Sequence, residues 1–210
     1  MTDKHALILL GHNGAGKSTL IRYLLGFYPD ERGHPFLPHW QHLPSYTDKT
    51  IGYVPELPFL DPHLTGWDTL KLQAKLNHTP LSKQQAGDAV NAVGLDSDVL
   101  THRIQTYSKG MRQRLMLAQA CYHKPDVLVL DEPLSGLDPF GHQAILDLLQ
   151  TMKQHSQLLL STHSLEDAYR LGDEIWLLQA GTLVYQGDKP GSIEALNDLY
   201  FKYPPHAIGH

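Results

Sequence analysis

Glycines, a lysine and two hydroxyl residues follow one another in a spacing that suits the binding of phosphate. The segment reads Gly11-His12-Asn13-Gly14-Ala15-Gly16-Lys17-Ser18-Thr19 and fits the pattern G-x-x-x-x-G-K-[ST] of phosphate-binding loops. The glycines let backbone N–H groups turn toward phosphate oxygens, and a following helix adds the positive end of its dipole. In such a loop Lys17 reaches the β- and γ-phosphates, and the Ser18 hydroxyl binds Mg²⁺. The segment therefore predicts a site for a nucleoside triphosphate with Mg²⁺.

Two adjacent carboxylates, Asp131 and Glu132, follow the apolar run Val127-Leu128-Val129-Leu130. A short apolar run of this kind predicts a buried strand. A carboxylate at the end of such a strand, where Asp131 stands, holds Mg²⁺ in phosphate-loop enzymes. Because successive side chains of a strand point to opposite sides, we expect Glu132 to face away from Asp131, toward an attacking water. The alternative interpretation is a pair of acidic residues at a strand end without a chemical role.

Short apolar runs separated by helical patterns predict an α/β fold with a parallel sheet, which would position these side chains. Buried strands are expected over residues 6–10, 127–130, 158–160 and 175–178. Helical spacing follows the phosphate loop and recurs over residues 139–154, with Asp138 expected as the N-cap and Pro139 in the first turn. Ser164 is expected to begin another short helix, and Gly181 to form the turn of a hairpin.

The middle of the chain differs, because it shows helical patterns with little strand signal. Thr65 and Ser82 are expected as helix N-caps, and Ser82 with Gln85 fits a capping box. These patterns predict a mostly helical lobe inserted between core strands. The expected division is a single domain over residues 1–210, with a core of residues 1–56 and 123–210 and a helical subdomain over about 57–122.

The composition narrows the classes of protein to which the chain can belong. It has 210 residues, of which 41% are hydrophobic and 19% charged, as is typical of a globular domain. The net charge of −5 and the lack of a Lys or Arg block give no indication of nucleic-acid binding. The single cysteine, Cys121, excludes an internal disulfide and is typical of a reducing compartment. No apolar run approaches the roughly 20 residues of a membrane span or forms a signal peptide, so we expect a cytoplasmic protein.

Histidine is abundant, with 14 residues in the chain. Three of them, His34, His39 and His42, lie in a stretch rich in proline and histidine over residues 33–44. Their spacing matches no strong zinc pattern, and carboxylate or thiolate partners are lacking nearby. A solvated loop is therefore the favoured interpretation of this stretch, and a metal site is the alternative.

The chain resembles the ATP-binding cassette (ABC) ATPases in the order and spacing of its motifs. Besides the phosphate loop, the resemblance is carried by Tyr107-Ser108-Lys109-Gly110-Met111-Arg112-Gln113-Arg114, Asp131-Glu132-Pro133, Ser135-Gly136-Leu137-Asp138 and Ser161-Thr162-His163. These segments are similar to the family's signature, Walker B motif, D-loop and switch histidine. The resemblance covers residues from about 6 to 187 and implies a P-loop NTPase (RecA-like) core with an inserted helical subdomain.

The resemblance also implies which residues form the site. In that family two cassettes pack head to tail around ATP, so that the phosphate loop of one faces the signature of the other. Ser108 is expected as the N-cap of a helix whose N-terminal end attracts anions. The implied catalytic residues are Lys17, Glu132 and His163. The implied Mg²⁺ ligands are Ser18, Glu56 and Asp131. The implied nucleotide-binding residues are Gly11, His12, Asn13, Gly14, Ala15, Gly16, Lys17, Ser18, Thr19, Ser108, Gly110, Met111 and Asp138.

Three features depart from the family's usual pattern. The signature reads Tyr-Ser-Lys-Gly-Met where Leu-Ser-Gly-Gly-Gln is common, although Ser108 and Gly110 are retained. Glu56 stands where the family usually carries glutamine, and its charge near the phosphates is expected to alter coupling. The family carries an antiparallel β part upstream of the loop, with an aromatic residue that stacks on adenine. Because ten residues precede Gly11, this part is expected to be largely missing.

The expected function is that of an ATP-binding and ATP-hydrolysing transporter subunit, which forms a homodimer on ATP and drives an integral-membrane permease. The cassette would lie on the inner face of the cell membrane, and Phe59, Leu60, Leu64 and Trp67 are candidates to contact the permease. The signature and Glu56 are similar to cassettes of ABC-2-type exporters. With the segments around Gly11 and Tyr53, they resemble the ATPase of the nitrous-oxide-reductase maturation system, which helps to assemble a copper centre.

Other functions are weighed against this expectation. The cassette of a drug or lipid exporter is one alternative. A soluble ABC protein, such as a translation or repair factor, is another, but the single phosphate loop and the lack of heptads argue against it. A nucleotide binder that has lost hydrolysis is a third. The presence of Lys17, Ser18, Asp131, Glu132 and His163 argues against that reading.

Overall fold

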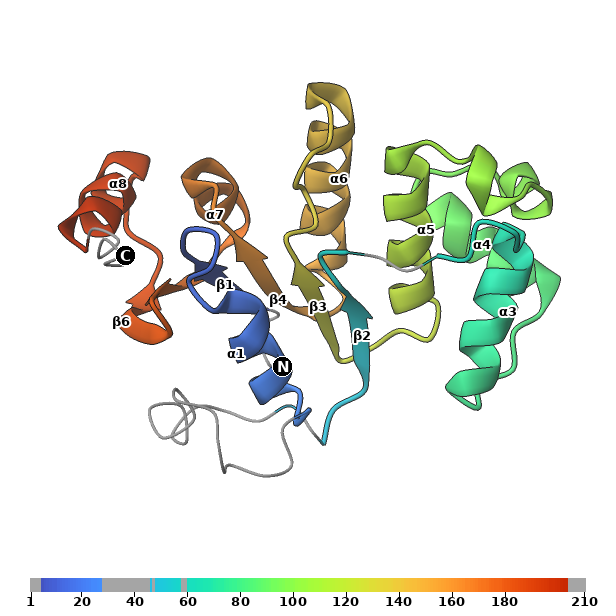
Figure 1. Ribbon diagram of the computed structural model, residues 1–210, viewed down its shortest axis with the longest axis horizontal. Helices are drawn as coiled ribbons and strands as arrows, with labels where there is room; N and C mark the ends of the chain where they lie inside the picture. The colour runs from blue at the N-terminus through green and yellow to red at the C-terminus, as the bar shows by residue number, and fades with distance from the viewer. Residues whose placement is uncertain (1–4, 28–45, 47, 58–59, 204–210) are drawn as a thin grey trace.

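The computed structural model describes residues 5–27, 46, 48–57 and 60–203 (Figure 1). The histidine-rich stretch over residues 33–44, with its candidate metal ligands His34, His39 and His42, lies outside the described residues, and so does Phe59. Within the described residues, no helix has the length and apolar character needed to cross a membrane.

One sheet forms the centre of the fold, and within the described residues it has six strands in the order β2-β3-β4-β1-β5-β6. The strands are β1 (Ala6–Leu10), β2 (Ile51–Val54), β3 (Val127–Asp131), β4 (Gln157–Thr162), β5 (Glu174–Gln179) and β6 (Thr182–Asp188). Neighbouring strands from β2 to β5 pair in parallel, and β6 pairs antiparallel with β5. The predicted parallel sheet and the hairpin at Gly181 are thus confirmed.

The strands of the sheet are apolar on both faces because helices cover both. Alternate residues of β1 enter different clusters: Leu7 and Leu9 pack with α1 (Lys17–Leu24), whereas Ile8 and Leu10 lie in the cluster that contains side chains of α6 and α7. Figure 1 shows α1 on one side of the sheet, and α6 (Pro139–Met152) and α7 (Leu165–Leu171) on the other. A strand buried on both faces reads as a continuous apolar run, which explains why the sequence reveals it.

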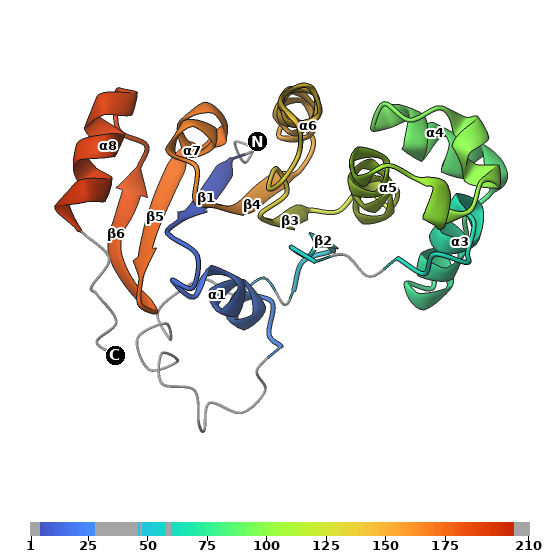
Figure 2. The same ribbon diagram turned by 45° about the horizontal axis from the view of Figure 1, so that its top comes forward.

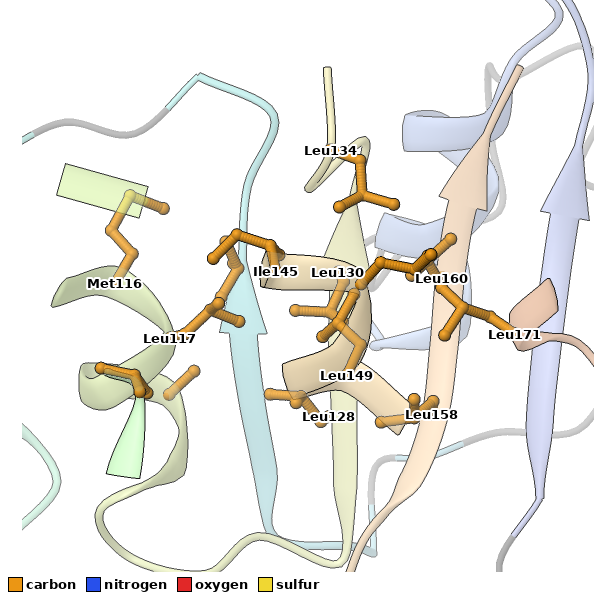
Figure 3. Close-up of a cluster of buried hydrophobic side chains, with 14 of the residues drawn as sticks. Met116, Leu117, Leu128, Leu130, Leu134, Ile145, Leu149, Leu158, Leu160 and Leu171 are labelled. Carbon is orange, nitrogen blue, oxygen red and sulfur yellow. The ribbon is translucent and has the colours of Figure 1, made fainter. Parts of the chain in front are cut away.

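Side chains of α6 form the centre of the larger cluster. Ile145 and Leu149 of this helix are buried and lie over Leu128, Leu130 and neighbouring leucines of β4 (Figure 3). The helix begins where its sequence predicts, because the Asp138 carboxylate accepts hydrogen bonds from the N–H groups of Phe140 and Gly141 at 3.1 and 3.0 Å, and Pro139 occupies the first turn. The packing therefore holds Asp138 at a fixed place beside the sheet.

The segment between β2 and β3 is helical. It holds α3 (Gly66–Leu76), α4 (Lys83–Ala92), two 3₁₀ turns (Ser97–Thr101 and Ile104–Thr106) and α5 (Lys109–Cys121). The predicted N-caps are confirmed: Thr65 begins α3, and Ser82 with Gln85 forms the capping box of α4. Figure 2 shows this lobe beside the β2 edge of the sheet, with α5 nearest to the core and α8 (Ile193–Lys202) at the opposite end.

The lobe joins the core through a close approach of α5 to β2. A Cβ atom added at Gly52 would overlap the backbone carbonyl of Ala120, and no rotation of a side chain can relieve such an overlap. The short strand β2 was not predicted from the apolar runs, because it lies at the sheet edge and alternates between buried and half-buried residues. Glycine at position 52 therefore sets how closely the lobe packs.

We predict that Gly52→Ala lowers the free energy of unfolding by about 1–3 kcal/mol, since the added methyl forces backbone to move. The matched control is Gly87→Ala in the middle of α4, where the new Cβ would make only ordinary contact with Ser97. That change should raise the free energy of unfolding by about 0.5–1 kcal/mol through helix propensity. Chemical denaturation of both variants measures the difference, and equal effects would contradict the packing argument.

Candidate functional site

The phosphate-binding loop lies between β1 and α1, at the carboxyl ends of the parallel strands. Gly14 and Gly16 have φ angles of 83° and 101°, a left-handed conformation that glycine adopts without strain. Gly16 is the N-cap of α1, and the first turn of this helix carries no acidic residue. The unpaired N–H groups at such a helix start attract anions. The predicted strand, loop and helix thus follow one another in the order that phosphate binding needs.

Lys17 folds back over its own loop. Its Nζ donates hydrogen bonds to the carbonyl oxygens of Gly11 and His12 at 2.7 and 3.2 Å, and the side chain is only 6% exposed. The same Nζ lies 2.9 Å from Glu132 Oε1. That oxygen has no hydrogen-bond partner among the described residues, so the contact is an ion pair without the directionality of a hydrogen bond. The structure therefore brings Lys17 and Glu132 together, as the motif resemblance implies.

Ser161 contacts both acidic residues at the end of β3, the carboxylate of Asp131 and the backbone of Glu132. It is fully buried in β4 opposite Asp131, and its Oγ donates a 2.6 Å hydrogen bond to Asp131 Oδ1. The same Oγ accepts a 2.9 Å hydrogen bond from the backbone N–H of Glu132. Sequence reasoning assigned Ser161 only to the switch motif and gave it no role. The available signal was a hydroxyl directly after a predicted strand, since such a group can reach a carboxylate at the same edge of a parallel sheet.

Glu132 is directed into the site by a turn of the backbone, and not by the strand alternation from which its direction was predicted. Strand β3 ends at Asp131, and Glu132 has a φ angle of 50°, which is uncommon for a residue other than glycine. The turn of the backbone, and not strand alternation, therefore directs its side chain. Glu132 Oε2 lies 2.9 Å from Nδ1 of His163, which follows β4. The carboxylate thus lies between the Lys17 ammonium and the His163 imidazole.

A cavity of about 320 Å³ opens at this place. It is lined by Asn13, Gly14, Gly16, Lys17, Ser18, Thr19, Glu56 and Glu132. The described residues contain no group of three His, Cys, Asp or Glu side chains that could by themselves hold a metal ion. The donors near the loop are instead a hydroxyl and separate carboxylates. Hard oxygen donors of this kind suit Mg²⁺, which is usually held by one or two carboxylates together with substrate phosphates.

Four other predicted residues lie in a second cleft, of about 390 Å³. Its lining includes Ser108, Gly110, Met111 and Asp138, and it shares no residue with the lining of the first cavity. Ser108 is the N-cap of α5, as predicted, because its Oγ accepts a 3.1 Å hydrogen bond from the N–H of Met111. The structure thus places most of the predicted nucleotide-binding residues in two clefts of one chain, whereas Gly11, His12 and Ala15 line neither.

Asp138 has a local role in addition to the one that the resemblance implies. Its pKa is lowered chiefly by the hydrogen bond from the Gly141 N–H; burial opposes this effect, and the hydrogen bond from the Phe140 N–H lowers the pKa further. The carboxylate is therefore ionised at neutral pH. Its charge lies at the N-terminus of α6, where the helix dipole stabilises an anion.

We predict that Ser161→Ala slows ATP hydrolysis by about 10- to 100-fold, because the Asp131 carboxylate and the backbone of Glu132 both lose the hydroxyl that positions them. The free energy of unfolding should fall by about 1–3 kcal/mol, since a buried Asp131 oxygen loses its partner. The matched control is Ser156→Ala, just before β4, which removes a buried hydroxyl bonded to the Pro125 carbonyl at 2.8 Å. It should cost similar stability and leave turnover unchanged. Equal turnover in the two variants would remove Ser161 from the site.

Sequence comparison places these features in a family. A sequence model of the family described as ABC transporter matches residues 1–135. The chain is 36% identical over 201 residues to the ABC transporter ATP-binding protein YdbJ of Bacillus subtilis, covering 94% of this chain and 65% of YdbJ. It is 35% identical over 205 residues to YthP of the same organism, covering 92% of this chain and 82% of YthP. Three curated relatives are longer than the chain, which spans 65%, 55% and 63% of their lengths.

Comparison with solved structures agrees on the fold. The dimeric structure of a bacterial ABC transporter cassette matches with a TM-score of 0.71 at 20% identity, over 91% of this chain and 88% of that one. The fold is thus that of an ABC ATPase cassette with a P-loop NTPase core. Because the family model covers more than half of the residues and YthP is matched over most of its length, the chain belongs to the ABC transporter family as one of its ATP-binding cassettes.

Proposed function

We propose that the chain is the ATP-hydrolysing subunit of an ABC transporter, and that two copies close head to tail around Mg·ATP. The observation that carries this proposal is the division of the motif residues between two clefts without a shared lining residue. The first cleft holds a phosphate loop with Lys17, and the second presents the N-terminus of α5. The first cleft lacks a signature helix and the second lacks a phosphate loop, so the second cleft of another copy would complete the site around the nucleotide. The whole chain then acts as one cassette, with residues 57–122 as its helical subdomain.

The residues of the first cleft suit ATP hydrolysis. Ser18, Asp131 and Glu56 would hold Mg²⁺, which supplies charge neutralisation for the phosphates. Glu132 accepts the proton of the attacking water, and the 2.9 Å contact with His163 keeps its carboxylate in place. Because the triphosphate and Glu132 are both anions, a bound nucleotide competes with Glu132 for the Lys17 ammonium. Binding of the substrate therefore releases Glu132 for its role as base.

Two features of the surface support pairing with a second copy. Phe140 is 89% exposed in the first turn of α6, next to Asp138, and large exposed aromatic residues are typical of interfaces. The cleft at the start of α5 opens beside the same turn. The solved cassette that this fold resembles is itself dimeric. We therefore propose a homodimer in which Asp138 and the signature residues Ser108, Gly110 and Met111 contact the nucleotide of the other copy.

A third cleft, of about 330 Å³, suits a membrane partner. It lies where β2 meets α3 and α5, and its lining includes Tyr53, Leu60, Gln73 and Gln119. Leu60 lines the cleft and is partly buried against the hydrophobic core, and Trp67 packs against the same core without lining the cleft. Leu72 and Leu76 of α3 are exposed nearby on the same helix as Gln73. We propose that a segment of an integral-membrane permease docks here, which would place the cassette at the cytoplasmic face of the membrane.

A narrower proposal concerns the cargo. The phosphate loop, the segment ending in Glu56 and the signature resemble those of the ATPase for nitrous-oxide-reductase maturation. This resemblance of motifs supports a role in assembling a copper centre. Its test is the cell's nitrous-oxide reduction after deletion of the gene, with copper content of the reductase as the readout. A deletion strain with a fully metallated reductase would contradict this role and leave the transporter proposal standing.

We predict that Lys17→Ala and Glu132→Gln both abolish ATP turnover, for different reasons. Lys17→Ala removes the cation that holds the phosphates, so the affinity for ATP should fall with the rate. Glu132→Gln removes the base and also the charge that competes for Lys17, so ATP should bind at least as tightly as in the unchanged chain. Only Glu132→Gln should therefore give a stable dimer with Mg·ATP, measured by size exclusion and by fluorescent-nucleotide binding. Retained turnover in Glu132→Gln would exclude Glu132 as the base.

The membrane partner can be tested by affinity purification from detergent-solubilised membranes. We predict that the chain co-purifies with a multi-spanning membrane protein, and that Gln119→Arg in the third cleft loses this partner while retaining ATP binding. Gln150→Arg, on the exposed face of α6, serves as the control and should keep it. Ribosomes or DNA in place of a membrane protein would instead support a soluble ABC factor.

A further inference from the structure

The signature segment carries a cation at an unusual position. Helix α5 begins at Lys109, and Ser108 is its N-cap. Backbone N–H groups make this end of a helix positive, so a lysine in the first turn is unfavourable unless its charge is compensated elsewhere. The family signature that the segment resembles commonly has glycine at this position. A compensating interaction is therefore expected in the fold.

The compensation comes from the loop that precedes α6. Lys109 Nζ donates hydrogen bonds to the backbone carbonyl oxygens of Ser135 and Gly136, at 3.1 and 2.7 Å. Gly136 has a φ angle of 64°, and a Cβ atom at this position would overlap Lys109 Nζ. The glycine thus both permits the turn of the loop and leaves room for the ammonium group. The two hydrogen bonds fasten the start of α5 to the loop within one chain.

The loop fastened in this way connects the two clefts. At one end Glu132 pairs with Lys17 in the first cleft, and at the other end Asp138 caps α6 beside the second. We propose that Lys109 is a positioning residue for ATP hydrolysis: it holds residues 135 and 136 against the start of α5, so that the surface offered to a second copy is assembled before the copies meet. The inference rests on the proposed function, because it requires two clefts that close on one nucleotide.

A different role for Lys109 would be direct contact with the phosphates bound by the second copy. The ammonium group is instead engaged with two carbonyl oxygens on the side of the loop. The two roles differ in what they predict for the isolated chain. A positioning residue orders the loop in the absence of nucleotide, whereas a phosphate contact has no effect before the copies meet.

The test uses the full chain with Glu132→Gln, so that ATP hydrolysis does not dissociate the dimer. Adding Lys109→Met should raise the protein concentration needed for the Mg·ATP dimer by about tenfold, the effect of losing a charge-assisted hydrogen bond. ATP affinity of the monomer should stay within about twofold, because Lys109 does not line the first cleft. Lys109→Arg, which can also donate to two carbonyls, should restore most of the dimer.

The matched control is Lys83→Met. Lys83 is likewise the first residue of a helix, α4, and follows a serine N-cap, so the same change there alters charge and helix start without reaching the loop. The Glu132→Gln chain that also carries Lys83→Met should form the Mg·ATP dimer at the same protein concentration as Glu132→Gln alone. An equal loss in Lys83→Met and Lys109→Met would overturn the proposal, because it would mark a general effect of charge.

Hydrogen exchange separates this inference from the proposed function. In the nucleotide-free chain, amides of residues 134–138 should exchange faster in Lys109→Met than in Lys83→Met. Exchange at the same rate would overturn the positioning role whatever the dimer does. If Glu132→Gln alone forms no dimer with Mg·ATP, the head-to-tail proposal is wrong. Faster exchange in Lys109→Met, and not in Lys83→Met, would even then show that Lys109 orders this loop.

Discussion

The parallel register of β1, β4 and β3 is the constraint on which the rest of the site depends. Leu9 of β1 lies opposite Ser161 of β4, and Ser161 lies opposite Asp131 of β3. The carboxyl ends of the three strands are therefore level, which is where ligands bind in sheets of this kind. The backbone bond from Gly11 N–H to the Thr162 carbonyl, at 3.2 Å, continues this alignment into the phosphate loop. A shift of one residue in either pairing would separate Lys17, the carboxylates and His163.

This alignment also explains the concentration of charge at the site. Asp131 is 2% exposed and Lys17 6% exposed, and buried charges persist in proteins only when they are paired or hydrogen-bonded. Here each has its partner: Asp131 has Ser161, and Lys17 has Glu132 and two carbonyl oxygens. The arrangement is poised for a polyanion, because a phosphate that enters the loop exchanges one anionic partner of Lys17 for another.

Sequence patterns predicted the elements of the core better than the details of the site. The apolar runs identified β1, β3, β4 and β5 because strands covered on both faces contain few polar residues. Strand β2 escaped because its residues at the sheet edge are only partly buried. The motif residues of the phosphate loop were found by spacing, since consecutive residues form that loop. The patterns did not reveal the backbone turn that directs Glu132. They did not reveal the role of Ser161 either, because it arises from contacts with residues 29 and 30 positions away in the chain.

The central place of β1 has a consequence for how the chain reaches its folded state. Strand β1 pairs with β4 and β5, and the Gly181 N–H of the following hairpin donates a 2.8 Å hydrogen bond to the Ala15 carbonyl. Strand β1 is thus completed by segments that the ribosome makes much later in the chain. Loop closure over such a distance slows folding. Until residue 181 has emerged, the phosphate loop lacks this hydrogen bond, so a nascent chain exposes the apolar strand β1 and an unfinished nucleotide site while the intervening residues are made.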